Sequence, residues 1–402
     1  ISDEGSAPIG KLTGISIINV SLEGGKGLDV YKSSVKLDNV KVSNSLGASI
    51  AISNGSNVEI SNTTTENGAW GSLGVMYKDG YAKSSVSILD GNNFEEGLLY
   101  EEGYKNQESN QITGLANWES FVNERDQLIW VRELPKGAYI SSDGVLSGCY
   151  NTIQAAIDTA DTGDTILIAS GTYDLTSTLT INKSITVQGI DKEEVILKGA
   201  NSITNTIYLG NGATLKNVTV TRDNTGDWAN NKNNQLINFY NSNDKTTTLE
   251  ECIITGGRNG VYVNNKTDIV IKDNLIDNNR TGIQMANCND ATVENNIITN
   301  NHTMGVLLLE FESVGTGKPI FTGNEIRDNW YSDFENRWAA EYVVDLTNNT
   351  FTDGTYKVAD TSGEPGYVEL RPVELGGSAT RPEDRTTFIM KTAGNLILPS
   401  LD

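Results

Sequence analysis

The sequence is short of cysteine and of long apolar runs, and each shortage excludes a class of protein. Its three cysteines, Cys149, Cys252 and Cys288, are too few for the disulfide framework of a small secreted domain. Cys252 and Cys288 fall at different points of the repeat described below, so we expect no bridge between them. No segment reaches the ~18 apolar residues that a membrane-spanning helix needs, which argues against membrane insertion.

Positive charge is also scarce, because 30 lysines and arginines stand against 52 aspartates and glutamates, for a formal charge of −22 at pH 7. Nucleic acids and anionic membrane surfaces bind proteins through basic patches, so neither is expected as a partner. Long-range attraction would instead favour cations. Two interpretations of this negative charge stay open. The protein could bind Ca²⁺, the only cofactor that we consider, or it could simply have an acidic, solvated surface.

One motif returns at nearly fixed intervals between residues 249 and 355. Its five copies are 22, 22, 28 and 25 residues apart and begin at Leu249, Ile271, Val293, Phe321 and Leu346. Each copy joins short runs of β-forming residues to turns rich in Asn and Gly. A period of about 22 residues with this pattern is typical of a solenoid, in which each coil holds about three short strands and stacks on the next at about 4.8 Å.

The fourth position of the motif is asparagine in every copy but the first, where it is Cys252. Stacked asparagine side chains can donate and accept hydrogen bonds along a solenoid and so satisfy polar groups inside it. We therefore predict a buried ladder made of Asn274, Asn296, Asn324 and Asn349.

Glycines recur once per coil after the motif, at Gly260, Gly282 and Gly305. We expect each of them to supply the positive φ of a sharp corner. In the strand that follows, alternate residues are predicted to point inward and outward. The inward set is Val261, Val263, Ile283, Met285, Val306 and Leu308, and the outward set is Tyr262, Gln284 and Leu307.

These repeats resemble the pectate-lyase-like, right-handed parallel β-helix superfamily, and the resemblance extends over most of the chain. It implies an all-β fold, a right-handed parallel β-helix built as a solenoid. It implies no single activity, because this fold hosts lyases, hydrolases, esterases, phage tailspikes and non-catalytic surface proteins.

The repeat pattern predicts two stacks of coils that together form an elongated acidic rod. Residues 1–99 form the first stack, residues 100–148 a connector, residues 149–360 the second stack and residues 361–402 a closing segment with strands at 387–390 and 396–398. The chain begins at Ile1 without a signal-peptide pattern or a helix to cover the first coil. We therefore expect it to be a piece of a longer chain, whose further coils or self-assembly would cover that end.

Two short helices and one strand are expected outside the repeats. In residues 117–125, Trp118, Phe121 and Val122 have helical spacing, and residues 128–131 read as a strand. Residues 152–160 place Ile153, Ala156 and their neighbours on one helical face, with Asn151 or Thr152 as N-cap. This second helix would cap the first coil of the second stack.

The catalytic motifs that the resemblance implies are missing. An esterase-like start, Gly171-Thr-Tyr-Asp174, carries Asp where that family has Glu, and the later aspartate motifs are absent. The hydrolase segments Asn-Thr-Asp, Asp-Asp and Gly-His-Gly and the lyase motif Arg-x-Pro-x-x-Arg are absent as well. No residue is therefore assigned a catalytic role by resemblance.

Four residues at the tenth position of successive copies should stand in one line: Arg258, Arg280, His302 and Trp330. Two stacked arginines repel each other unless an anion or a carboxylate lies between them. This column could therefore hold an acidic glycan, with the Trp stacking on a sugar ring. Alternatively, Asp277 and Asp328 neutralise the turn and nothing binds.

Two insertions are the other candidate sites, because function concentrates on loops of a rigid scaffold. Residues 222–232 contain Asp223 and Asp227, which could bind Ca²⁺. Residues 330–338 mix aromatic and charged side chains that suit carbohydrate binding, although the aromatics could instead pack the loop onto the wall. The candidates here are Trp330, Tyr331, Asp333, Glu335, Arg337 and Trp338.

The leading interpretation is a secreted or cell-surface structural or adhesive β-helix protein without catalytic activity, such as an adhesin stalk or a surface-layer component. Its grounds are the missing catalytic set and the uncovered first stack. The alternative is a polysaccharide lyase or other carbohydrate-active enzyme on acidic glycans, working where the column meets residues 330–338. A third interpretation is a non-catalytic module that binds a polysaccharide or surface glycan through the same aromatics.

Overall fold

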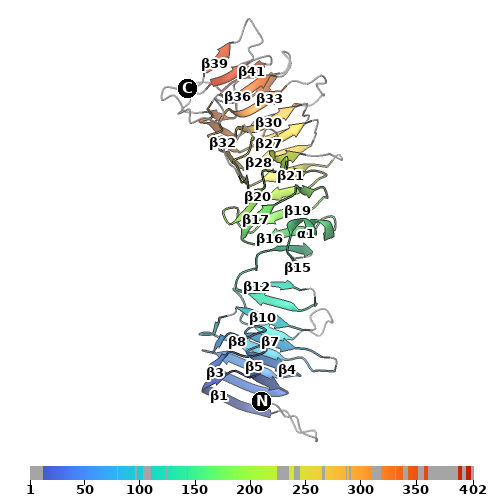
Figure 1. Cartoon of the computed structure of the whole chain (residues 1–402), viewed down its shortest axis with the longest axis vertical. Coiled ribbons are helices and arrows are strands. Elements are labelled where there is room, and N and C mark those ends of the chain that lie inside the picture. The colour runs from blue at the N-terminus through green and yellow to red at the C-terminus, as the bar shows by residue number, and fades with distance from the viewer. Residues whose placement is uncertain are drawn as a thin grey trace. The chain divides into compact units, whose positions relative to one another are not determined.

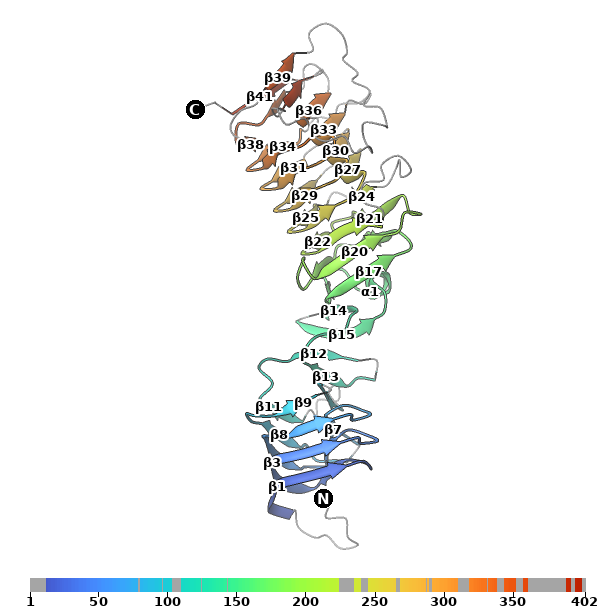
Figure 2. The same ribbon diagram turned by 60° about the vertical axis from the view of Figure 1, so that its left-hand side comes forward.

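The chain divides into two compact units, Ile1–Pro135 with Ser141–Cys149, and Lys136–Ile140 with Tyr150–Asp402. A computed structural model of the protein describes residues 12–78, 80–95, 97–102, 110–123, 125–142, 144–223, 235–239, 245–264, 268–286, 288, 291–309, 318–330, 332–337, 343–351, 357–360, 388–391 and 395–399. In both units the strands of successive coils lie side by side (Figures 1 and 2).

The second unit is built from three parallel sheets, which we call its first, second and third walls. The first wall contains β16 (Thr165–Ile168), β19 (Thr186–Gly189), β22 (Thr214–Lys216), β25 (Thr247–Glu250), β28 (Ile269–Lys272), β31 (Ala291–Glu294) and β34 (Ile320–Thr322). The second contains β17 (Gly171–Leu175), β20 (Val195–Gly199), β23 (Thr219–Arg222), β26 (Ile253–Thr255), β29 (Leu275–Asp277), β32 (Ile297–Thr299), β35 (Glu325–Arg327) and β38 (Thr350–Phe351).

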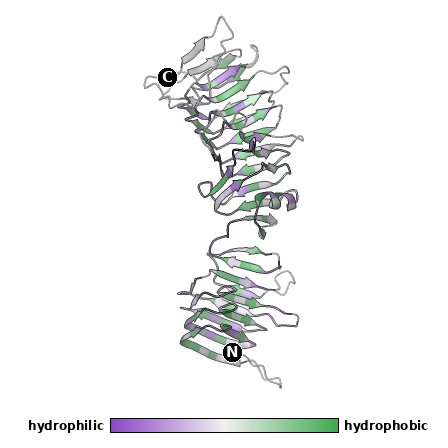
Figure 3. Ribbon diagram, in the orientation of Figure 1, coloured by the Kyte–Doolittle hydropathy of each residue, from purple (hydrophilic) through white to green (hydrophobic). Residues whose placement is uncertain are grey.

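The third wall contains β18 (Leu179–Ile181), β21 (Asn205–Leu209), β24 (Gln235–Phe239), β27 (Asn259–Asn264), β30 (Thr281–Ala286), β33 (Met304–Leu309), β36 (Ser332–Arg337), β40 (Phe388–Lys391) and β39 (Lys357–Asp360). Its register places Val261 beside Ile283, which lies beside Val306, and all three are fully buried as predicted. Of the predicted outward set, Tyr262 and Gln284 are half-buried, whereas Leu307 is buried as well. Hydrophobic and hydrophilic residues alternate along the strands in Figure 3.

The predicted asparagine ladder is confirmed at the turn between the first and second walls. Asn274 donates from its backbone N and its Nδ2 to Asn296 Oδ1 at 3.0 and 2.9 Å. Asn296 donates in the same way to Asn324, and Asn324 to Asn349. Cys252, a free thiol, begins the series, because its backbone N donates to Asn274 Oδ1 at 2.9 Å. The ladder thus satisfies buried groups in every coil that it crosses.

A second ladder, which we did not predict, runs along the turn between the second and third walls. Gly257 N donates to Asn279 Oδ1 at 2.9 Å, Asn279 N to Asn301 Oδ1 at 3.0 Å, and Asn301 N to Asn329 Oδ1 at 3.1 Å. These residues occupy the ninth position of the motif, and Asn279, Asn301 and Asn329 are buried. Each coil therefore carries two interior polar contacts to the next.

The prediction that the recurring glycines adopt positive φ is wrong. The positive φ values fall instead on the third and eighth positions of the motif, at Glu251, Gly256, Asp273, Asn278, Asn295, Asn300, Gly323 and Asp328. Gly260, Gly282 and Gly305 are needed for space, because an added Cβ on each would lie 2.6 to 2.9 Å from the Nδ2 of a second-ladder asparagine. Glycine is required here by the close approach of the next coil.

Helix α1 (Ile153–Thr159) covers one end of the second unit, as predicted. Thr152 is its N-cap, and its hydroxyl accepts a hydrogen bond from Ala155 N at 3.2 Å. Ile153 and Ile157 are buried in the same core as the strand residues that follow. At the other end of the chain, the predicted closing strands are confirmed as β40 and β41 (Asn395–Ile397), and β41 pairs with β37 (Val343–Asp345).

The first unit consists of two sheets. One contains β1 (Leu12–Glu23), β3 (Ser33–Ser43), β5 (Asn57–Ser61), β6 (Thr64–Glu66), β8 (Ser85–Ile88), β9 (Asn93–Phe94) and β11 (Gln111–Thr113). The other, which we call its platform sheet, contains β2 (Leu28–Tyr31), β4 (Ile50–Ser53), β7 (Leu73–Met76), β10 (Leu98–Glu101), β13 (Leu128–Val131) and β12 (Glu119–Val122). Strands β14 (Ala138–Ser142) and β15 (Val145–Tyr150) contain the division between the units.

The helix predicted over residues 117–125 is wrong, whereas the strand predicted at 128–131 is confirmed as β13. The segment forms β12, which pairs antiparallel with β13. The turn between them is closed by Asn123, whose Oδ1 accepts hydrogen bonds from Arg125 N at 2.9 Å and Gln127 N at 3.0 Å. Pairing with β13 buries Phe121 and thereby overrides the helical spacing.

Candidate functional site

The column of tenth-position residues stands at the corner that the second ladder holds. Backbone hydrogen bonds stack it coil upon coil, from Arg280 N to Gly257 O at 2.8 Å, from His302 N to Asn279 O at 2.7 Å, and from Trp330 N to Asn301 O at 2.8 Å. The structure therefore brings Arg258, Arg280, His302 and Trp330 into one line, with steps of about 4.8 Å between neighbouring coils. Arg258 and Arg280 directly precede β27 and β30 of the third wall, and His302 and Trp330 lie two residues before β33 and β36.

Arg258 and Arg280 make this corner positively charged on an otherwise acidic protein. Burial, and then the charge of Arg258, lower the pKa of Arg280 to about 10, so both guanidinium groups are charged at neutral pH. Burial also lowers the pKa of Arg258. The Nε of Arg280 is buried without a hydrogen-bond partner among the described residues. A buried donor of this kind is costly unless an acceptor binds to it.

The ion pairs of the described residues join neither Asp277 nor Asp328 to Arg280. Asp328 pairs with Arg327 at 3.0 Å. Burial raises the pKa of Asp277, whose carboxyl group accepts a hydrogen bond from Thr255, one coil earlier. Within the described part of the chain, no carboxylate lies within 4 Å of the Arg280 guanidinium. An anion from outside could therefore fill that role.

His302 is the next residue of the column and the single histidine of the chain. Its Nε2 lies 2.9 Å from Asn278 Oδ1, so a neutral ring donates from Nε2 and carries its acceptor lone pair on Nδ1. Partial burial lowers the pKa of His302, which keeps the imidazole neutral at pH 7. The corner thus places a proton acceptor one coil away from Arg280.

The prediction of a loop at residues 330–338 is wrong, because residues 332–337 form β36 in the third wall. Asp333, a predicted glycan ligand, is fully buried and ends the second ladder. Glu335 is also fully buried and pairs with Arg337. Burial raises the pKa of Glu335, although the hydrogen bond and the charge of Arg337 oppose this. Tyr331 and Trp338 lie outside the described residues.

The structure describes one of the two candidate metal ligands. Asp223 accepts a salt bridge from Lys198 at 2.8 Å, and Asp227 lies outside the described residues. No group of three or more His, Cys, Asp or Glu side chains that could hold a metal occurs in the described parts of the chain. Among those same parts, no helix is long and apolar enough to cross a membrane.

One comparison with known proteins agrees with the fold of the second unit. Residues 183–364 match the family model described as a right-handed β-helix region. Two of the solved structures that match are a double mutant of the periplasmic alginate epimerase AlgG and the A-module of the Azotobacter vinelandii mannuronan C-5 epimerase AlgE4. The first is 14% identical with a TM-score of 0.27 and covers 96% of this chain and 75% of its own. The second is 11% identical with a TM-score of 0.28 and covers 99% and 85%.

No curated protein matches the sequence. The leading interpretation of a non-catalytic adhesin stalk or surface-layer component is corrected here, because both of these solved structures are named as epimerases. In the second unit, the three-walled solenoid and the matched segment confirm the fold expected from the repeats, a right-handed parallel β-helix.

Proposed function

We propose that the second unit is a lyase-type enzyme that acts on an acidic polysaccharide at the Arg258–His302 corner. The observation that carries this proposal is the pair of arginines in adjacent coils, of which Arg280 keeps a buried Nε donor without a described acceptor. A uronate carboxylate is a planar anion that accepts two parallel hydrogen bonds from a guanidinium. Binding it would both supply the missing acceptor and relieve the repulsion between the two arginines.

Neutralising the carboxylate makes the proton on the adjacent carbon easier to remove, because the charge that develops on the carboxylate oxygens is stabilised in place. The neutral imidazole of His302 takes that proton as general base. The electron pair of the broken C5–H bond forms the C4=C5 double bond. The C4–O4 bond breaks, and the leaving oxygen takes a proton from solvent. Trp330, next in the column, offers a flat surface to the neighbouring sugar ring.

The test is turnover of polygalacturonate and polymannuronate, followed by the ultraviolet absorbance of the unsaturated product, with added Ca²⁺ and with a chelator. We expect turnover of one of these polymers and a loss of roughly 100- to 1,000-fold in kcat/KM in Arg280→Ala. Arg327→Ala is the matched control, because this arginine of the second wall is already paired with Glu325 and Asp328. Absence of product, or equal rates for the two variants, would overturn the proposal.

Two further parts of the proposal concern location and metal. A polymeric uronate is met outside the cytoplasm, so we propose that this protein is secreted. The chelator arm of the assay tests Ca²⁺ as a second means of neutralising the carboxylate.

A further inference from the structure

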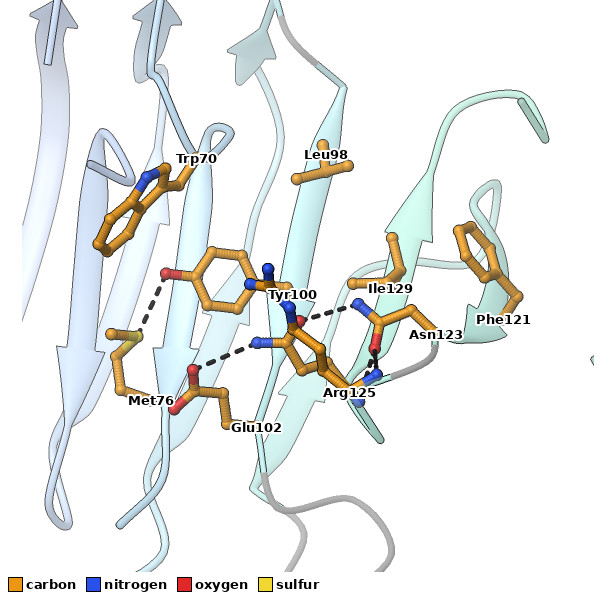
Figure 4. Close-up of a pocket in the computed structure, with 10 residues that line it drawn as sticks. Trp70, Met76, Leu98, Tyr100, Glu102, Phe121, Asn123, Arg125 and Ile129 are labelled. Carbon is orange, nitrogen blue, oxygen red and sulfur yellow. Dashed lines mark hydrogen bonds between the residues drawn. The ribbon is translucent and has the colours of Figure 1, made fainter. Parts of the chain in front are cut away.

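A hollow of about 530 Å³ lies on the outer face of the platform sheet in the first unit (Figure 4). Strands β7, β10, β12 and β13 and the turn after β12 supply its lining. A second hollow of about 300 Å³ shares Trp70, Met76 and Tyr100 with the first and continues over β2 and β4. The two hollows therefore form one groove across the strands, with Trp70 where they meet.

Two glycines, Gly74 in β7 and Gly47 in the bend before β4, leave room for aromatic rings. A Cβ on Gly74 would lie 2.4 Å from the Cζ and Oη of Tyr100, its neighbour in register, so the ring covers this glycine. A Cβ on Gly47 would lie 3.7 Å from Cε3 of Trp70, so the indole rests over the backbone there. Trp70 nevertheless keeps 61% of its surface exposed. The Trp70 indole thus contacts the protein at Gly47 while most of its surface stays accessible to a ligand in the groove.

A network of planar polar side chains forms the opposite wall of the larger hollow. Asn123 Nδ2 donates to Gln127 Oε1 at 2.8 Å, and Gln127 Nε2 donates to Glu102 Oε1 at 3.2 Å. The other carboxylate oxygen of Glu102 accepts from Tyr77 N at 3.3 Å. These bonds hold the wall in place while leaving amide hydrogens and carboxylate lone pairs for a ligand.

The charges along the groove balance. The larger hollow has one cation, Arg125, and one anion, Glu102, and the smaller hollow has Lys26 and Asp29. The salt bridges of the described residues leave no carboxylate within 4 Å of the Arg125 guanidinium. The groove therefore offers hydrogen-bond donors and acceptors without the excess of cations that would select a polyanion.

We propose that this groove binds an uncharged chain of pyranose sugars. A pyranose ring has an apolar face of C–H groups, which suits an exposed indole, and a rim of hydroxyls, which suits amide, carboxylate and guanidinium groups. A groove that crosses six strands at about 4.8 Å each accepts several sugar rings in a row. The groove would bind an uncharged sugar chain, whereas the arginine corner of the second unit would bind an acidic one, and neither site depends on the other.

The test is isothermal titration of the intact chain with β-1,4-linked hexasaccharides of glucose, mannose and xylose, and with hexagalacturonate as the charged comparison. We expect at least one neutral hexasaccharide to bind and Trp70→Ala to weaken it about tenfold or more, which corresponds to ~1.4 kcal/mol. Arg125→Ala should weaken binding as well. Ile18→Ala, which also removes an exposed apolar side chain of the first unit, should leave it unchanged.

Three outcomes would overturn the inference: no neutral hexasaccharide binds, only hexagalacturonate binds, or Trp70→Ala binds like the unsubstituted chain. Circular dichroism of each variant shows whether the fold is retained. Arg280→Ala separates this inference from the proposed function, because it should abolish turnover of polyuronate without changing the affinity for the neutral sugar.

Discussion

Asn329 donates both its backbone N and its Nδ2 to one oxygen of Asp333, at 3.2 and 2.9 Å, so the second ladder ends on a carboxylate. In the preceding coils the same acceptor is an asparagine Oδ1. Because the next coil begins with β36, Asp333 takes its place from within a strand of the third wall. These hydrogen bonds connect the end of the second ladder to β36, the strand that also contains Glu335 and Arg337.

Replacing Asp333 should show what this acceptor contributes. Asp333→Ala leaves two buried donors of Asn329 without their acceptor, and we expect it to lower the free energy of unfolding by roughly 1–3 kcal/mol. Asp333→Asn keeps the oxygen and should cost less. Chemical denaturation compares the two variants. Equal losses would show that the donors of Asn329 find other acceptors.

Replacing an asparagine in the middle of the first ladder should destabilise the protein more than replacing Asp333. Asn296→Ala removes an acceptor used by Asn274 and donors used by Asn324 Oδ1 and Ile271 O. We expect the free energy of unfolding to fall by roughly 2–5 kcal/mol, because several buried polar groups lose partners at once. Thr292→Ala, on the outer side of the neighbouring β31, is the control and should change the free energy of unfolding little. A small loss in Asn296→Ala would mean that water enters the turn.

A substitution can test whether the recurring glycines are required because the next coil leaves no room for a side chain. An added Cβ on Gly282 would lie 2.5 Å from Gly305 O, a backbone atom that cannot easily move. We expect Gly282→Ala to destabilise the fold by about 1–3 kcal/mol through overpacking, measured as a lower denaturation midpoint. Gly47→Ala meets only ordinary contacts at 3.7 Å and serves as the control. Equal stability of the two variants would contradict the close-approach explanation.

The proposed general base gives a kinetic prediction. His302→Ala should lower kcat on polyuronate by roughly 100- to 10,000-fold, the usual contribution of a positioned base, with little change in KM. Much of the His302 side chain lies at the surface, so the denaturation midpoint should stay close to that of the unsubstituted protein. A rise in KM at constant kcat would instead assign His302 to substrate binding.

The pH profile of kcat/KM should have two limbs of opposite sign. His302 must be neutral to accept a proton, and its pKa is lowered from 6.5, so activity should fall only as the pH drops through a value below 6.5. Arg280 must be charged to bind the carboxylate, and its pKa is about 10, so activity should fall again as the pH rises through about 10. Loss of the acid limb in His302→Ala would confirm its assignment, and its persistence would refute it.

The solenoid could be predicted because stacking repeats the same requirement in every coil. Asn274 and its counterparts recur at the spacing of the coils, and each lies where a buried amide must meet the next one. The same signal was present for Asn279, Asn301 and Asn329 at the ninth position, and it would have predicted the second ladder. The glycines recur equally clearly, but their spacing does not say whether a turn or a neighbouring coil requires them.

The errors concern segments whose state depends on a partner far along the chain. Residues 117–125 have helical spacing, yet pairing with β13 makes them a strand. Residues 330–338 look like an insertion, yet β33 accepts residues 332–337 as the next strand of the third wall. Local pattern is a weak guide wherever an unpaired strand edge is available nearby.

By itself, the sequence determined that this protein contains stacked coils of short strands with asparagines inside their turns, because the spacing of polar and apolar residues repeats in every coil. Only the tertiary structure decided which charges meet. It placed Arg280 beside Arg258 without a described carboxylate, enclosed Asp333 and Glu335, and laid Trp70 over Gly47 in an open groove. The reason is physical, since burial and pairing depend on neighbours that one stretch of sequence does not contain.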